Sequence, residues 1–179
     1  ARARINPHVA AWLILEGSDL SHPVVQGQDN ESYLDRLFDG SYNASGCLFL
    51  DSRCEARFAS PNSIVYGHHM KDGSMFAALD GYKEQEFYEA HPSLLLLTPG
   101  GDYEAQVFSA YVAPTDAAAW RLDFEGEGAY AAWLAEVCAA SCIETGLVPG
   151  QAERVLTLST CSYEFSDARL VVHCVLREL

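Results

Sequence analysis

The chain closes with two apolar, β-rich segments, and this feature constrains its fold more than any other. We expect one strand over residues 154–160 and a second over residues 169–177, because β-branched and apolar side chains dominate both. Cys161 stands directly after the first segment, and Arg169 opens the second eight residues later. A thiol at the tip of one strand and a guanidinium at the mouth of the next suit acyl transfer, in which the thiol attacks a carbonyl and the cation holds the oxyanion.

A histidine at the end of an earlier strand completes this set of groups. The sequence predicts a strand over residues 63–66, and the tetrapeptide GHHM follows it at 67–70. His68 is the acid and base that such chemistry requires. Because three complementary groups stand at strand exits, we expect them to share one site without a cofactor. The chain holds no CxxC pair, so we expect no metal site either.

Length, composition and charge narrow the class of protein. A chain of 179 residues, 49% of them hydrophobic, is long enough for one domain spanning residues 1–179. The formal net charge of −14 would repel phosphate groups, so nucleic acid is not an expected partner. We interpret the acidic surplus as a solubilising surface, or alternatively as a surface that favours cationic amine acceptors. The apolar runs are all shorter than the roughly 20 residues that cross a bilayer.

The six cysteines do not read as a disulfide scaffold, because a chain of this length and apolarity does not need one. Cys47 and Cys54 flank a short predicted strand and turn, and they are either free or bridged in an extracellular setting. Cys138 and Cys142 stand four residues apart on one predicted helical face. We expect both to be buried as small apolar side chains rather than bridged.

The order of the remaining elements favours a mainly β fold. Further strands are predicted over residues 9–15, 23–27, 46–51, 94–98 and 103–112. A helix is expected from Asp29 or Asn30 through Phe38, brief helices over 75–79 and 84–90, and a long alanine-rich helix between Gly126 and Gly146. An antiparallel sheet curled into a barrel, with helices inserted in its connections, fits this order better than alternating β-α-β units.

Three motifs in order carry a resemblance to a known family. They are TLSTC at 157–161 with Arg169 after the next turn, YGHHM at 66–70 with KDGSMF at 71–76, and early matches at 6–12, 23–26 and 29–34. In this pattern the chain resembles the class B branch of the sortase family over nearly its whole length. The resemblance implies a closed sortase-type β-barrel of about eight strands, with an N-terminal helix and a helix inserted between two late strands.

The resemblance also implies an activity and a location. A sortase of this class is a cysteine transpeptidase on the extracellular face of a Gram-positive cell membrane, anchored by an N-terminal segment that these residues do not include. It cleaves a C-terminal sorting signal of the Asn-Pro-x-Thr-Asn/Gly or Pro-x-Thr-Gly type after the threonine, through a thioacyl-enzyme. The expected partners are secreted proteins with such a signal and an amine of the peptidoglycan precursor, or alternatively a pilin lysine.

Site roles follow from the same resemblance, residue by residue. It implies that Cys161 is the nucleophile, His68 the acid and base, and Arg169 the oxyanion donor. The substrate-binding positions that it implies are Asn30, Leu34, Ser159 and Thr160.

The chain departs from some class B members directly after the cysteine, where they carry acidic residues and this chain carries Ser162 and Tyr163. Asp72 and Glu164 are the local candidates for a carboxylate that orients His68. Arg169 has an alternative as a simple ion-pair partner of Asp167 or Glu164. Three further histidines, His69, His91 and His173, are expected to have no catalytic role.

Two other classes of function stay open on the residues alone. The barrel is a non-enzymatic peptide-binding module if the cysteine is structural. It is a cysteine hydrolase if the acyl group passes to water rather than to an amine.

Overall fold

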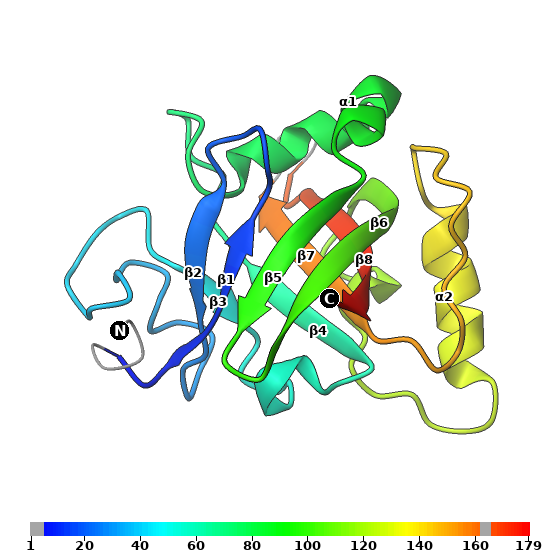
Figure 1. Cartoon of the computed structure of the whole chain (residues 1–179), viewed down its shortest axis with the longest axis horizontal. Coiled ribbons are helices and arrows are strands. Elements are labelled where there is room, and N and C mark those ends of the chain that lie inside the picture. The colour runs from blue at the N-terminus through cyan, green and yellow to red at the C-terminus, as the bar shows by residue number, and fades with distance from the viewer. Residues whose placement is uncertain (1–5, 162–165) are drawn as a thin grey trace.

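Eight strands close into a barrel in the order β1-β2-β3-β4-β7-β8-β6-β5 (Figure 1). The computed structural model describes residues 6–161 and 166–179, with Cys161 described through its backbone alone. The strands are β1 Val9–Ile14, β2 Ser21–Val25, β3 Leu48–Leu50, β4 Asn62–Tyr66, β5 Ser93–Thr98, β6 Gly101–Ala113, β7 Val155–Cys161 and β8 Arg169–Glu178. The predicted mainly β, closed barrel is therefore confirmed.

The barrel is mostly antiparallel, as expected, but two of its strand pairs are parallel. β2 pairs with β3 and β4 pairs with β7 in parallel. The second pair arises because the chain leaves β4, forms β5 and β6 on the opposite side of the barrel, and returns only at β7. Parallel strands end at the same edge of a sheet, so β4 and β7 deliver the residues that follow them to one place.

Helix α2, Ala129–Ala139, lies between β6 and β7 in the chain, as expected for the inserted helix. It packs beside the barrel (Figure 1), where Trp133, Leu134 and Val137 are buried in one cluster with side chains of β6, β7 and β8. A second, larger cluster fills the barrel interior. The strands β6, β7 and β8 are thus covered on both faces. This accounts for the unbroken buried run from residue 170 to 176 of β8.

The helix expected from residue 29 or 30 to residue 38 does not form. Asp29 does accept hydrogen bonds from the backbone N–H groups of Glu31 (2.9 Å) and Ser32 (2.7 Å), as a helix cap would. The chain then folds back, because the N–H of Asn43 reaches the carbonyl of Asp35 (2.9 Å). The apolar side chains of the segment divide between environments, with Tyr33 buried and Leu34 41% exposed, so no common helical face exists to stabilise a helix.

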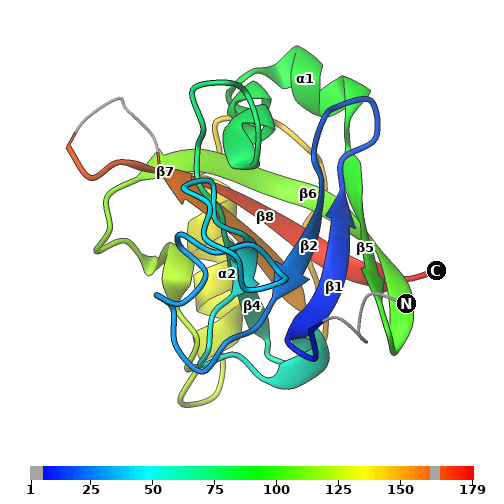
Figure 2. The same ribbon diagram turned by 90° about the vertical axis from the view of Figure 1, so that its left-hand side faces the viewer.

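Short helices occur near both other expected positions. The 3₁₀ helix η3 spans Phe76–Lys83 and the α-helix α1 spans Gln85–Ala90, and they lie together at one end of the barrel (Figure 2). Two further 3₁₀ turns are η2, Ala56–Phe58, and η4, Ala118–Trp120. No helix in the described part of the chain is long and apolar enough to span a bilayer.

The cysteines are free thiols wherever the structure describes their side chains. Cys47 and Cys54 are both buried and unbridged. The expectation that Cys138 and Cys142 are both buried was wrong, since Cys138 is half-buried and Cys142 is exposed. The two do not share a helical face, because α2 ends at Ala139 and the N–H of Cys142 bonds instead to the carbonyl of Ala110 on β6 (2.8 Å).

Candidate active site

Three neighbouring strands bring the predicted catalytic positions to one edge of the barrel. β4 runs parallel to β7 with Tyr66 opposite Ser159, and the N–H of Gly67 continues the ladder to the carbonyl of Ser159 (3.2 Å). His68 follows directly. β7 pairs antiparallel with β8, and Cys161 at the end of β7 is opposite Arg169 at the start of β8. The side chain of Cys161, and Ser162, Tyr163 and Glu164, lie outside the described residues.

A cleft of about 260 Å³ opens at this edge. The residues that line it are Leu34, Phe49, Tyr66, Gly67, His68, Ser159, Thr160 and Arg169. The described site residues expected from the sequence therefore share this cleft, with the exception of Asn30. Leu34 comes from the loop between β2 and β3, and the others come from β3, β4, β7 and β8 or the two residues after β4.

His68 is held by close packing of the loop that carries it. Gly67 has no room for a side chain, because a Cβ there would lie 2.5 Å from Leu48 and 2.7 Å from Phe76. The carbonyl of His68 accepts a hydrogen bond from the N–H of Phe76 (3.0 Å). The imidazole Nε2 lies 2.6 Å from the carbonyl oxygen of Leu34.

Asp72, one of the two candidates for a carboxylate beside His68, does not contact the imidazole. That side chain accepts hydrogen bonds from the N–H (3.0 Å) and the hydroxyl (2.6 Å) of Ser74 in its own turn. Arg169 is half-buried, and its guanidinium donates to the carbonyl of Ala168 (3.0 Å). Between described residues, no ion pair joins Arg169 to Asp167.

Comparison with known proteins agrees with this geometry. The family model described as a sortase domain matches residues 13–177. The chain belongs to the sortase family. Sortase B of Staphylococcus aureus is 37% identical over 171 residues, which cover 94% of this chain and 70% of that protein. Sortase B of Listeria monocytogenes is 30% identical over the same share of each chain.

Solved structures extend the likeness to the whole fold. The Staphylococcus aureus sortase B–substrate complex superposes with a TM-score of 0.94 at 35% identity, covering 99% of this chain and 83% of the other. Clostridium perfringens sortase B superposes with a TM-score of 0.91 at 31% identity, covering 98% and 97%. These matches confirm the class B resemblance. The chain is thus a sortase transpeptidase. Sortases join proteins that carry a sorting signal to amines at the Gram-positive cell surface.

One contact to a residue that lines the cleft in this sortase was not foreseen from the sequence. The indole N–H of Trp120, in η4, donates to the hydroxyl of Ser159 (3.0 Å). Ser159 is only 1% exposed, so this contact occupies its hydroxyl. Thr160 is also buried, and its hydroxyl has no hydrogen-bond partner among the described residues. No local pattern marks Trp120, because the insertion of α2 decides where η4 lies.

Tyr66 forms one wall of the cleft, and the sequence analysis missed it although a signal existed. It precedes His68 by two residues, and alternate strand positions share a face. Its hydroxyl donates to Asp51 (3.1 Å), and its ring packs on Phe49 at 5.4 Å between centroids. Burial raises the pKa of Tyr66, which therefore stays a hydrogen-bond donor.

Asn30 lies behind this wall rather than in the cleft. Its side-chain oxygen accepts from the N–H of Ser52 (2.8 Å). Burial opposes ionisation of Asp51, but hydrogen bonds from Arg53 and Asn30 hold the pKa of that carboxyl below its usual value. Asn30 thus stabilises the buried charge that anchors Tyr66, and its contact with substrate stays a prediction.

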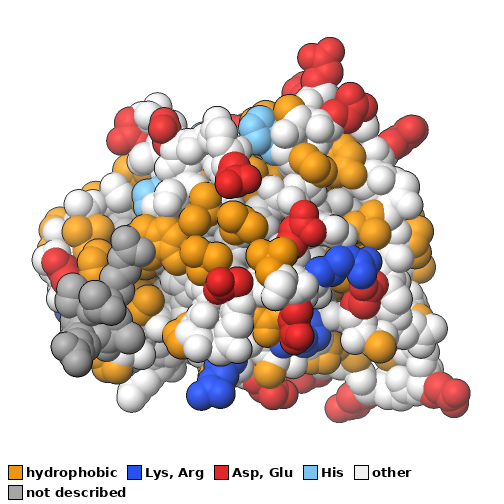
Figure 3. Space-filling model, viewed as in Figure 1, with side chains coloured by type: hydrophobic (Ala, Val, Ile, Leu, Met, Phe, Trp, Pro, Cys, Tyr) orange, Lys and Arg blue, Asp and Glu red, His pale blue; other side chains and the backbone are white. Residues whose placement is uncertain are grey.

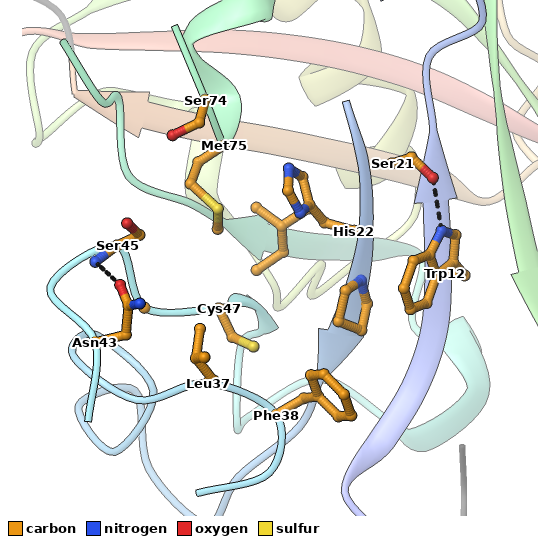
Figure 4. A pocket seen from close by; sticks show the side chains of 13 residues that line it. Trp12, Ser21, His22, Leu37, Phe38, Asn43, Ser45, Cys47, Ser74 and Met75 are labelled. Atoms are coloured by element: carbon orange, nitrogen blue, oxygen red, sulfur yellow. Dashed lines mark hydrogen bonds between the residues drawn. The ribbon is translucent and has the colours of Figure 1, made fainter. Parts of the chain in front are cut away.

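A second, larger cavity of about 390 Å³ lies against the loop between β2 and β3, residues 26–47, which is called the 26–47 segment below (Figure 4). Its lining includes Trp12, His22, Phe38, Cys47 and Met75. Burial raises the pKa of the Cys47 thiol to about 11, so that sulfur is not an activated nucleophile. This larger cavity shares no lining residue with the cleft at the strand exits. Acidic side chains lie scattered over the face in Figure 3 and do not form a single patch.

Proposed function

We propose that this sortase uses Cys161 as the nucleophile, His68 as the acid and base, and Arg169 as the oxyanion donor. The convergence of the β4, β7 and β8 ends on one cleft supports these roles. The substrate would be a sorting signal of the Asn-Pro-x-Thr-Asn/Gly or Pro-x-Thr-Gly type, cleaved after its threonine. The acceptor would be the amine of a peptidoglycan precursor, and residues 1–179 would act as one catalytic domain.

The first half-reaction forms a thioacyl-enzyme. A free thiol has a pKa of about 8.5, so attack requires a cation or base nearby. His68 takes the proton of the Cys161 thiol, the resulting thiolate adds to the carbonyl carbon of the threonine, and the oxyanion is stabilised by the Arg169 guanidinium. The tetrahedral intermediate then collapses, the C–N bond breaks, and His68 donates its proton to the departing amine.

The second half-reaction reverses these roles. His68 is now neutral and accepts a proton from the incoming neutral amine as the nitrogen of that amine attacks the thioester carbonyl. The C–S bond breaks, and the thiolate leaves as the new amide forms. One histidine serves both steps because it ends the first half in the state that the second half requires.

The cleft offers matching features for a peptide. Leu34 is exposed at its rim and the Tyr66 ring forms its wall, and both suit the proline of the signal. The hydroxyl of Thr160 is a candidate partner for a peptide backbone group. Solved sortase B structures include one in complex with substrate and one in complex with triglycine, which supports a peptide donor and a glycine-type amine acceptor. We place the enzyme outside the cell, on a membrane anchor beyond these residues.

A peptide screen tests the function directly. Peptides with each signal type would be incubated with the protein, and the acyl adduct would be located by mass spectrometry. We expect an adduct on Cys161 and cleavage after threonine, and we expect Cys161→Ala to lower cleavage by at least about 10⁴-fold. Cys142→Ala, the same change at an exposed cysteine, is the matched control and should leave the rate unchanged.

The acceptor is identified by adding amines to the same reaction. Triglycine and a lysine-containing peptide would compete, with water as the background. We expect the triglycine adduct to dominate. A dominant lysine adduct would indicate pilin polymerisation, release of free acid alone would indicate a hydrolase, and peptide binding without cleavage would leave a non-enzymatic module.

A further inference from the structure

The contact between His68 and Leu34 specifies the protonation of the imidazole. The distance from Nε2 to the carbonyl oxygen is 2.6 Å. A carbonyl oxygen has lone pairs and no proton, so Nε2 must carry the hydrogen of this bond. In the neutral imidazole the other nitrogen, Nδ1, is then the proton acceptor.

We propose that the backbone carbonyl of Leu34 is the positioning group of His68, in the role that a side-chain carboxylate has in a catalytic triad. The proposal rests on the catalytic role of His68 given above. The carbonyl orients the ring, selects the Nε2–H tautomer, and stabilises the imidazolium by accepting from its N–H. Proton exchange with the sulfur and with the substrate amines then takes place at Nδ1.

The residues around His68 leave this role to a backbone group. Within residues 6–160 and 166–179, no carboxylate forms a hydrogen bond or ion pair with the imidazole. Asp72 is turned to Ser74, as described above. The other described titratable groups that line the cleft are Tyr66, which donates to Asp51, and Arg169, which remains cationic at working pH.

The position of the carbonyl is enforced by Gly46. This glycine has a φ of +60°, and a Cβ on it would lie 2.5 Å from the carbonyl oxygens of both Leu34 and Tyr33. The next residue, Cys47, donates its N–H to the carbonyl of Tyr33 (3.0 Å). Tyr33 is anchored in turn, because its hydroxyl lies 2.8 Å from the side-chain amide nitrogen of Asn6 and 2.9 Å from Nδ1 of His8.

Nitrogen NMR tests the contact without any substrate. In ¹⁵N-histidine-labelled protein, about two pH units above the ordinary histidine pKa of about 6.5, the His68 ring nitrogens report which one is protonated. His68→Gln identifies the signal. We expect the Nε2–H tautomer to dominate, and a dominant Nδ1–H tautomer would overturn the proposal.

Two glycines of the same segment provide a matched pair. Gly40 also has a left-handed φ, +87°, but a Cβ there meets nothing within 4 Å. Gly46→Ala and Gly40→Ala therefore impose similar backbone strain, and only the first displaces the Leu34 carbonyl. We expect Gly46→Ala to lose the tautomer preference and to reduce the acylation rate at saturating peptide by about tenfold. Equal effects of the two variants on the tautomer preference and on the acylation rate would contradict the proposal.

An ester substitution covers the case in which Gly46→Ala does not fold. Replacing Asp35 with its α-hydroxy analogue converts the Leu34 amide to an ester, whose carbonyl is a weaker acceptor. The N–H that this removes donates no backbone hydrogen bond in the described structure. We expect the acylation rate to fall by about fivefold with an unchanged KM, and an unchanged rate would overturn the proposal. Because the NMR signal needs no turnover, a failed sorting reaction would be recognised separately.

Discussion

Two regions of the molecule meet at the same cleft: the strands β4, β7 and β8, and the 26–47 segment. The strands are stabilised by burial and pairing, whereas the segment is stabilised mainly by local turns. The described side chains of β7, residues 155–160, are all buried, and β8 is paired on both sides along most of its length. Between residues 26 and 45 the one buried side chain is Tyr33, and local turns such as that of Asp29 hold the backbone. The strands position Arg169 and the Cys161 backbone, whereas the segment contributes one carbonyl to His68. Packed strands thus place the proposed catalytic groups, and a lightly packed segment contacts one of them, His68.

Removing Trp133 should show how strongly the strand framework is stabilised. Trp133 is 1% exposed, and its indole N–H donates to the carbonyl of Ala118 (2.8 Å). We expect Trp133→Ala to lower the free energy of unfolding by about 3–5 kcal/mol, measured by urea denaturation. Tyr42→Ala, at a 77% exposed aromatic residue of the 26–47 segment, is the control and should change it little. A loss below about 1 kcal/mol in the tryptophan variant would contradict the assigned core.

Arg169→Lys tests whether geometry or charge matters at the mouth of β8. Lysine retains the charge but lacks the planar fork that bridges two oxygens. We expect kcat for peptide cleavage to fall by about 100-fold with little change in stability. Arg177→Lys, near the far end of the same strand, is the control, since Arg177 pairs with Glu153 (2.9 Å). Near-normal turnover by Arg169→Lys would remove Arg169 from the oxyanion role.

The burial of His173 among the strands should make the free energy of unfolding depend on pH. It is fully buried between Thr157 (2.8 Å) and Tyr111 (3.0 Å), and burial lowers its pKa to about 3. Below about pH 6.5, His173 binds a proton in the unfolded chain but stays neutral in the folded chain. Stability from this group is therefore complete above about pH 6.5 and falls by up to about 1.4 kcal/mol per pH unit as pH decreases toward 3.

The measurement is urea unfolding at several values of pH. His173→Gln preserves hydrogen bonding but cannot titrate, so its unfolding free energy should fall less steeply below about pH 6.5. His91→Gln, at a half-buried position outside the barrel, should keep the wild-type slope. Parallel slopes for wild type and His173→Gln would mean that His173 titrates normally in the folded protein.

The smallest expected effect lies in the 26–47 segment. Tyr33→Phe removes the hydroxyl that contacts Asn6 and His8 and should lower stability by about 1 kcal/mol. Hydrogen exchange should accelerate at the amides of the segment and not at those of β8, because the segment opens locally. Equal acceleration in both regions would show that the two unfold as one unit.

The sequence predicted the strands better than it predicted the 26–47 segment. Residues 154–160 and 169–177 are strands by composition and also by burial, so local preference and tertiary packing agree. At Asp29 the local signal for a helix cap was real and its hydrogen bonds form, yet no apolar face exists to continue the helix. The prediction that Cys142 is buried failed for a similar reason, because its burial depended on where α2 ends.

The sequence by itself determined the strands, the inserted helix and the family, because alternating side chains and ordered motifs are written in residue identities. It also named His68 and Arg169, which the tertiary structure then placed in one cleft. Only the tertiary structure decided that the indole of Trp120 donates a hydrogen bond to Ser159 and that Asn30 lies behind Tyr66. It also decided that the backbone carbonyl of Leu34 contacts His68. Every residue has a carbonyl, so a contact made by one has no sequence signature and depends on how distant segments pack.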